Sequence, residues 1–304
     1  MFSVTAKNLK KSYGSTIAIE NISFEINNNE LFGFIGPDGA GKTTLFRILT
    51  SLLIPDEGKA EILGFDIIKN YKELRQILGY MPGRFSLYQD LSVEENLTFF
   101  ATIFGTTIHD NYDLIKDIYS HIEPFKARPA GKLSGGMKQK LALSCALIHK
   151  PQVLILDEPT TGVDAVSRKE FWQMLKNLQK KNITIIVSTP YMDEASLCDR
   201  VALIQKGHIM TIDTPGKIIS RFGDTLWAIR SKNLYKLKTD LLNYNRCRTA
   251  YLFGQFVHFT SKENIESGEL HEYILKNNHS EIEIKKIQPG IEDCFMDLMA
   301  AENS

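Results

Sequence analysis

The segment Gly36–Thr43 constrains the fold of this chain more than any other part of its sequence. It reads Gly-Pro-Asp-Gly-Ala-Gly-Lys-Thr and matches the pattern G-x-x-x-x-G-K-[ST]. The run before it, Leu31–Ile35, is apolar throughout, which predicts a strand buried on both faces of a sheet. Apolar residues at helical spacing follow within 45–53, and Pro55 ends them. The context therefore predicts a strand, a phosphate-binding loop and a helix.

The chemistry of such a loop depends on its backbone and on two side chains. Glycines let several N–H groups turn toward phosphate oxygens, and the helix N-terminus adds partial positive charge. Lys42 would neutralise the β- and γ-phosphates, and the Thr43 hydroxyl would ligate Mg²⁺. Kinases, GTPases and many ATPases share this pattern, so the loop alone leaves the class open. The loop residues predicted to bind the nucleotide are Gly36, Pro37, Asp38, Gly39, Ala40, Gly41, Lys42 and Thr43.

A second apolar run, Val153–Leu156, ends in two carboxylates, Asp157 and Glu158. The first carboxylate is suited to the second coordination shell of Mg²⁺, and the second to polarising a water that attacks the γ-phosphate. Acidic pairs at strand ends are also often just solvated, which is the alternative for this pair.

A third element, Leu133-Ser134-Gly135-Gly136-Met137, lies about two dozen residues before the acidic strand. Ser134 is predicted to cap a helix that runs over Met137–His149. The glycine amides at that N-terminus would form a second anion site.

The composition limits the classes of protein. With 304 residues, the chain has room for about two domains. Lys plus Arg and Asp plus Glu both number 36, so there is no basic excess for gripping nucleic acid, and no nucleic-acid partner is expected. No uncharged run approaches the ~20 apolar residues of a spanning helix. The four cysteines are widely spaced and fit neither a zinc site nor a disulfide framework, which favours a reducing, cytoplasmic location.

The chain is expected to change character at Pro215. Before it, strands are predicted at Ser3–Leu9, Ile17–Ile26, Ile77–Met81 and Ile183–Val187, mostly helix over Val93–His149, and a hairpin over Val201–Asp213. After it, the predicted order is β-α-β-β-α-β-α, which suggests a small ferredoxin-like unit. We therefore predict a nucleotide-binding domain over residues 1–214 and an accessory α+β domain over 215–304.

Taken together, the three elements resemble the nucleotide-binding subunit of ABC transporters, over residues 1 to about 214. That resemblance implies an α/β P-loop NTPase fold with an antiparallel β subdomain and a helical subdomain. It makes Gly36–Thr44 the Walker A loop, which adds Thr44 to the nucleotide-binding residues, and Leu133–Met137 the signature. Asp157 and Glu158 become the Walker B aspartate and the catalytic base, and Asp164 the D-loop aspartate. Tyr13 matches an aromatic that stacks on adenine; an ordinary surface tyrosine is the alternative.

In the family, two subunits pair head to tail, and ATP lies between the Walker A loop of one and the signature of the other. The resemblance thus implies ATP and Mg²⁺ as ligands, a second ATPase subunit, identical or different, and separate transmembrane permease subunits. The segments Tyr191–Ala195 and Pro289–Phe295 are most similar to the ABC-2 export branch. A peripheral position on the cytoplasmic face of the membrane follows. Tyr88, Phe99, Phe100 and Phe104 lie where the family forms its groove for the membrane subunit.

Two positions depart from the family pattern. Gly83 stands where the family has a glutamine that reaches Mg²⁺ and the attacking water, and Pro190 where it has a histidine that contacts the γ-phosphate. Neither residue offers a side-chain donor; Gln89 is a candidate substitute for the glutamine. The hypothesis is that this site binds ATP but hydrolyses it slowly, while the intact signature completes a site on a different partner. Alternatively, this branch tolerates both substitutions.

Two further functions compete with an export ATPase. One is a soluble ABC-type ATPase acting on ribosomes or DNA, although such proteins usually carry two ATPase halves or a coiled-coil insertion. The other is a nucleotide-dependent binding module that does not hydrolyse ATP.

Overall fold

The fold divides between Thr214 and Pro215 into two units, residues 1–214 and residues 215–304. The structure is a computed structural model that describes residues 2–302, with side chains described through residue 300. Each unit is described separately below. Among the described residues, no helix is both long enough and apolar enough to cross a membrane.

A six-stranded sheet forms the centre of the first unit, in the order β10-β9-β3-β8-β7-β6. All neighbours from β9 to β6 run parallel, and β10 pairs antiparallel with β9. Because parallel strands end at one edge, the loops after β3, β6, β7 and β8 share that edge. The strands are β3 (Leu31–Ile35), β6 (Leu78–Met81), β7 (Val153–Asp157), β8 (Thr184–Thr189), β9 (Arg200–Gln205) and β10 (His208–Asp213).

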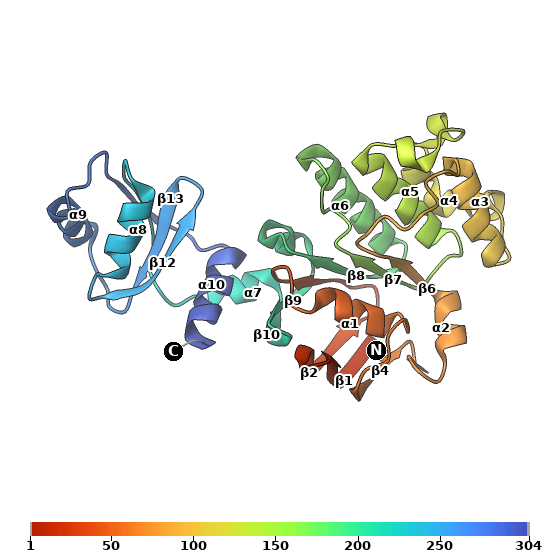
Figure 1. Cartoon of the computed structure of the whole chain (residues 1–304), viewed down its shortest axis with the longest axis horizontal. Helices are drawn as coiled ribbons and strands as arrows, with labels where there is room; N and C mark the ends of the chain where they lie inside the picture. The colour runs from red at the N-terminus through yellow and green to blue at the C-terminus, as the bar shows by residue number, and fades with distance from the viewer. Residues whose placement is uncertain (1, 303–304) are drawn as a thin grey trace. The chain divides into compact units, whose positions relative to one another are not determined.

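A second, antiparallel sheet has the order β2-β1-β4-β5 and comprises β1 (Phe2–Tyr13), β2 (Thr16–Asn27), β4 (Glu57–Ile62) and β5 (Phe65–Asp66). Helix α1 (Lys42–Leu49) lies between the two sheets (Figure 1). Phe34 of β3 makes edge contacts with Phe24 of β2, at 5.0 Å between ring centroids, and with Phe46 of α1, at 5.7 Å. This shared core fixes the helix that begins at Lys42 against both sheets.

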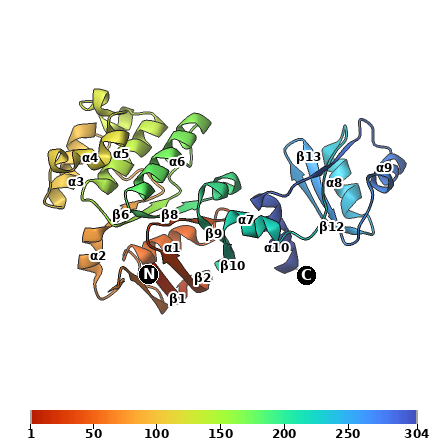
Figure 2. The same ribbon diagram turned by 180° about the vertical axis from the view of Figure 1, so that it is seen from behind.

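Helices cover the opposite face of the six-stranded sheet, as both views show (Figures 1 and 2). Of these, α5 (Gly135–Leu147) and α6 (Ala165–Lys180) contact the sheet, and α3 (Val93–Ile103) and α4 (Ile108–Tyr119) pack against α5. Helix α2 (Tyr71–Ile77) lies at the edge near β6. Each of the four long helices begins at a side-chain cap. For α3 the cap is reciprocal: Ser92 accepts from the Glu95 N–H, and Glu95 accepts from the Ser92 N–H.

The α/β class with an antiparallel subdomain and a helical subdomain was predicted correctly. Helix is broken over 93–149 by two short 3₁₀ turns, Glu123–Phe125 and Ala130–Lys132. The first two strands are longer than predicted, and β4, β5 and α2 were not predicted. β4 buries only two of its six residues, so its sequence, Glu-Gly-Lys-Ala-Glu-Ile, carries little apolar alternation.

The second unit contains a four-stranded antiparallel sheet in the order β12-β13-β11-β14. Its chain order, β11-α8-β12-β13-α9-β14, is that of a ferredoxin-like unit. Short helix α7 (Pro215–Ser220) precedes it and was not predicted. The other elements are β11 (Leu226–Arg230), α8 (Leu234–Leu242), β12 (Cys247–Phe253), β13 (Phe256–Ser261), α9 (Ser267–Lys276), β14 (Glu283–Ile287) and α10 (Ile291–Glu302).

Candidate nucleotide-binding site

In the loop between β3 and α1, two glycines, Gly36 and Gly41, leave no room for a side chain. A Cβ on Gly36 would lie 2.1 Å from the carbonyl oxygen of Ile204 on β9. Gly41, directly before α1, has φ +101°, and a Cβ there would lie 2.5 Å from the Ala18 carbonyl oxygen. The loop is therefore wedged between the two sheets, with its backbone fixed at the start of a helix.

Lys42 is only 3% exposed, although it carries a charge. Its Nζ donates to the carbonyl oxygens of Gly36, at 2.7 Å, and Pro37, at 3.0 Å. The same Nζ lies 3.2 Å from Oε1 of Glu158. Two backbone carbonyl oxygens thus hold the Lys42 ammonium inside the loop. The carboxylate of Glu158, which follows β7, faces it across the sheet edge.

A cavity of about 330 Å³ opens over this loop. Tyr13, at the end of β1 and 48% exposed, lines the cavity together with the loop and Glu158. The structure therefore brings together most of the predicted nucleotide-binding residues, which come from three separate parts of the sequence. The predicted residues that line it are Tyr13, Asp38, Gly39, Ala40, Gly41, Lys42, Thr43, Thr44 and Glu158.

The two carboxylates after β7 are in different environments. Asp157 is buried and accepts a 2.6 Å hydrogen bond from the hydroxyl of Ser188, its neighbour in register on β8. Glu158 is partly exposed, and its backbone has φ +49°, in the left-handed region. The Glu158 N–H donates to both the carbonyl oxygen (3.1 Å) and the hydroxyl (2.9 Å) of Ser188. The strained turn therefore directs Glu158 toward Lys42 while Asp157 remains inside the sheet edge.

The predicted signature lies outside this cavity, at the N-terminus of α5. Ser134 caps the helix by accepting from the Met137 N–H at 3.3 Å, as predicted, and Leu133 before it is buried. Gly136 packs against α6, where a Cβ would lie 2.8 Å from Oγ of Ser167. The helix begins at Gly135, two residues earlier than expected.

Asp164 caps α6 by accepting from the N–H groups of Ser167, at 3.0 Å, and Val166, at 3.1 Å. These hydrogen bonds, led by that of Ser167, hold the pKa of the Asp164 carboxyl below its ordinary value. Since Ser167 also lies against Gly136, the predicted D-loop and the predicted signature are neighbours within one chain.

Gly83 and Pro190 follow β6 and β8, at the same sheet edge. A Cβ on Gly83 would lie 3.1 Å from the Asp157 carbonyl oxygen, a contact tighter than ordinary packing. Gln89 is not among the described residues that line the cavity; its carbonyl oxygen accepts from the Gly131 N–H at 2.9 Å. The structure thus gives no support to Gln89 as a substitute for the missing glutamine.

A second cavity of about 330 Å³ lies between β6, the loop after it, α3 and α5. Phe100 and Phe104 line it, but Phe99 and Tyr88 instead contact one another, with ring centroids 4.9 Å apart. Burial, aided by the Asp157 charge, raises the pKa of Tyr80 on its wall to about 12. The lining is mainly apolar with polar groups at the margin; it includes Met81, Arg84, Phe85, Gln139, Ala142 and His149.

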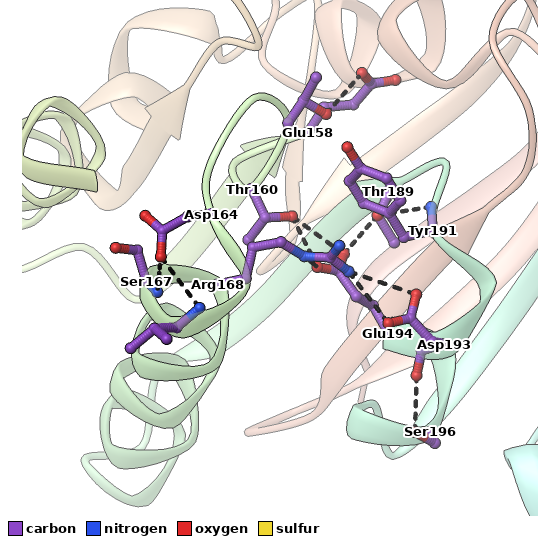
Figure 3. Close-up of polar contacts among 12 residues, drawn as sticks. Glu158, Thr160, Asp164, Ser167, Arg168, Thr189, Tyr191, Asp193, Glu194 and Ser196 are labelled. Atoms are coloured by element: carbon purple, nitrogen blue, oxygen red, sulfur yellow. Dashed lines mark hydrogen bonds and ion pairs between the residues drawn. The ribbon is translucent and has the colours of Figure 1, made fainter. Parts of the chain in front are cut away.

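Four polar residues around the site were not singled out by the sequence analysis. Ser188, Thr160, Arg168 and Glu194 connect the ends of β7 and β8 with α6, and all but Ser188 are labelled in Figure 3. The predicted strand Ile183–Val187 ended one residue before Ser188, which the parallel register of the structure places opposite Asp157. The others meet only through the tertiary fold, and no local pattern indicates their contacts.

The fold and the first cavity define a P-loop nucleotide-binding protein. The profile of the family described as "ABC transporter" matches residues 19–161. The chain is 37% identical over 286 residues to the probable multidrug ABC transporter ATP-binding protein YbhF of Escherichia coli K12, covering 93% of this chain but 49% of that protein. It is 36% identical over 214 residues to the Nod factor export ATP-binding protein I of Rhizobium sp. strain N33, covering 69% and 70%.

The linearmycin resistance ATP-binding protein LnrL of Bacillus subtilis is 35% identical over 226 residues, covering 73% of this chain and 72% of that protein. Among solved structures, cbiO1 from Clostridium perfringens, part of the ABC transporter complex cbiONQ, has a TM-score of 0.65 at 27% identity, covering 72% and 91%. The chain therefore belongs to the family of ABC transporter ATP-binding proteins. It spans about half the length of the Escherichia coli relative.

Proposed function

We propose that this chain binds and hydrolyses ATP as the nucleotide-binding subunit of an export system. The observation that carries the proposal is the cavity in which the Lys42 ammonium, the loop amides, Tyr13 and Glu158 converge. A polyphosphate would take the place of carbonyl and carboxylate partners around Lys42 Nζ, and Tyr13 would stack on the base. The export assignment rests on relatives named for multidrug transport, Nod factor export and linearmycin resistance.

Magnesium fits the oxygens available at this site. Mg²⁺ binds through one or two protein oxygens and completes its coordination with phosphate and water oxygens. The Thr43 hydroxyl and the Asp157 carboxylate, the latter through water, are the proposed holders, and Ser188 fixes the orientation of Asp157. When bound, the ion neutralises charge on the transferring phosphoryl group.

Glu158 is the proposed base that orients the attacking water. In this structure its carboxylate pairs with Lys42, and ATP binding would release it from that contact because the phosphates compete for the ammonium. Gly83 and Pro190 supply no side-chain donor toward the γ-phosphate. We therefore propose that binding is strong while hydrolysis at this site is slow.

The position of the signature supports action as a head-to-tail pair. Ser134, Gly135 and Gly136 lie away from the chain's own phosphate loop, so they would bind the phosphates of a partner subunit's ATP. The apolar groove containing Phe100 and Phe104 is the proposed docking site for a separate transmembrane permease subunit. With such partners, the chain would lie peripherally at the cytoplasmic face of a membrane.

Affinity purification of the full chain from gently solubilised membranes tests this proposal. We expect a membrane protein and a second ATPase chain, or a second copy, to co-purify, and the complex to hydrolyse ATP. Recovery without any membrane protein would contradict the transport function and favour the soluble alternative. A complex that binds ATP without turnover would favour the binding-module alternative.

A further inference from the structure

The carboxylate of Glu194 is almost completely buried, at 2% exposure, close to the candidate site. It lies in a short 3₁₀ helix, Met192–Leu197, just after β8. Three donors converge on it (Figure 3): the hydroxyl of Thr160 at 2.9 Å, the hydroxyl of Thr189 at 2.5 Å and Nε of Arg168 at 3.1 Å. A buried carboxylate satisfied by three donors from three other segments holds those segments at fixed separations.

The three donors come from segments next to residues of the candidate site. Thr160 is two residues after Glu158, Thr189 directly precedes Pro190, and Arg168 is four residues after Asp164. The Arg168 N–H donates to the Asp164 carbonyl oxygen at 2.9 Å within α6. One carboxylate therefore connects the segment of the base, the end of β8 and the helix that follows the D-loop.

Glu158 needs such an anchor on its C-terminal side. Its left-handed backbone, at φ +49°, is unfavourable for a residue with a side chain, so the surrounding structure must hold it. On the N-terminal side of Glu158, its backbone N–H donates to the carbonyl oxygen and the hydroxyl of Ser188. On the other side, the side chain of Thr160, 1% exposed, is held through its hydroxyl by Glu194.

Arg168 makes this burial of charge tolerable. Its guanidinium carbon lies 4.1 Å from the centre of the Tyr191 ring, and its second nitrogen lies 3.2 Å from the Asp193 carboxylate. The Tyr191 N–H donates to the Thr189 hydroxyl at 3.1 Å, which in turn donates to Glu194. The loop that carries Pro190 is thus fixed by groups that are not among the described residues lining the candidate nucleotide cavity.

We propose that Glu194, paired with Arg168, is a positioning residue for ATP hydrolysis at this site. It holds the Glu158 segment against the end of β8 in a chain whose residue 190 contributes no donor of its own. The inference deepens the proposed ATPase function and rests on it. Loss of the Glu194 carboxylate should lower the rate of ATP hydrolysis and leave nucleotide binding by the Lys42 loop unchanged.

Isosteric substitutions in the purified full chain test the inference. Glu194→Gln keeps the shape but removes the charge and one acceptor oxygen, and Thr160→Val removes one donor. For both, we expect kcat to fall about 10- to 100-fold at unchanged KM, as for other displacements of catalytic groups by about 1 Å. Thr160→Ser, which restores the hydroxyl, should restore kcat. Hydrogen exchange of the backbone over residues 158–164 should become faster in the first two variants only.

Glu30 offers a matched control, since it is another buried carboxylate, 6% exposed, paired with an arginine, Arg200, at 3.3 Å. It precedes β3, at the end of the strand remote from the phosphate loop. Glu30→Gln should lower thermal stability as much as Glu194→Gln does, but leave kcat and exchange over 158–164 unchanged.

Each outcome decides a separate question. If the wild type turns over ATP and both Glu194→Gln and Thr160→Val keep its kcat, the inference is overturned. The ATPase proposal would remain intact. Equal loss of kcat in Glu30→Gln would also overturn the inference, because stability alone would then explain the effect. If the purified wild-type chain, without other subunits, shows no turnover above that of Glu158→Gln, hydrolysis at the chain's own site is contradicted. Unchanged exchange over 158–164 would then overturn the positioning role, and faster exchange would support it.

Discussion

The two sides of the candidate site differ in what their side chains offer to a nucleotide. On the loop side, Lys42 is buried within the proposed phosphate-binding loop, and Glu158 faces it at 3.2 Å. On the side formed by the ends of β6 and β8, Gly83 and Pro190 present no side-chain donor. We therefore propose that the two sides serve two tasks: the loop side binds a nucleoside triphosphate, whereas fast hydrolysis also needs groups that contact the γ-phosphate.

The largest expected effect is on the loop side. Lys42→Met removes the ammonium that would contact the β- and γ-phosphates, so ATP affinity should fall by about 100-fold or more, since losing one partner of a buried charge contact costs ~3 kcal/mol. Fluorescence titration with a nucleotide analogue measures this. Lys59→Met, an exposed lysine on β4, is the control and should bind normally. Equal affinity in both variants would place the nucleotide elsewhere.

A gain of function is expected on the opposite side. Pro190→His restores a donor at the end of β8, so we expect kcat to rise about tenfold with little change in ATP affinity. Phosphate release under saturating ATP gives this rate. Pro190→Ala removes the ring without adding a donor and should show no gain. An unchanged rate in Pro190→His would mean that the missing donor does not limit turnover.

Placing a glutamine at residue 83, where the family has one, should destabilise the fold. A Cβ at residue 83 would lie 3.1 Å from the Asp157 carbonyl oxygen, so Gly83→Gln should lower the free energy of unfolding by about 1–3 kcal/mol. Thermal unfolding measures this loss. Gly83→Ala separates the cost of the Cβ from that of the longer side chain. A fully stable Gly83→Gln with faster hydrolysis would show that the end of β6 can adapt.

The smallest effect concerns His149, which lines the groove beside β6. Burial lowers the pKa of this imidazole, so the unfolded chain binds the proton more readily. Its contribution to stability is complete above about pH 6.5 and decreases as the pH falls toward the lowered pKa, by at most ~1.4 kcal/mol per pH unit. Urea unfolding at pH 7.5 and 5.5 tests this, and His149→Gln should reduce the difference. A pH dependence unchanged in His149→Gln would contradict the assignment.

The same comparison shows which features the sequence could reveal. The phosphate loop, the helix cap at Ser134 and the ferredoxin-like order of the second unit depend on local patterns that short segments carry. The contacts of Glu194 with Thr160 and Arg168 join residues 26 to 34 positions apart, and they arise only when β7, β8 and α6 are packed. Strand β4 was not predicted because it buries only two of its six residues, so its sequence shows no clear apolar alternation.

The most direct test of slow hydrolysis at an intact binding site is Glu158→Gln in the complex assembled with its partners. If this site contributes little to turnover and its signature serves the partner's site, the variant complex should retain most of the wild-type rate. ATP binding to the complex should be unchanged. A fall of turnover to background would contradict the account, because the Glu158 site would then be the one that hydrolyses ATP.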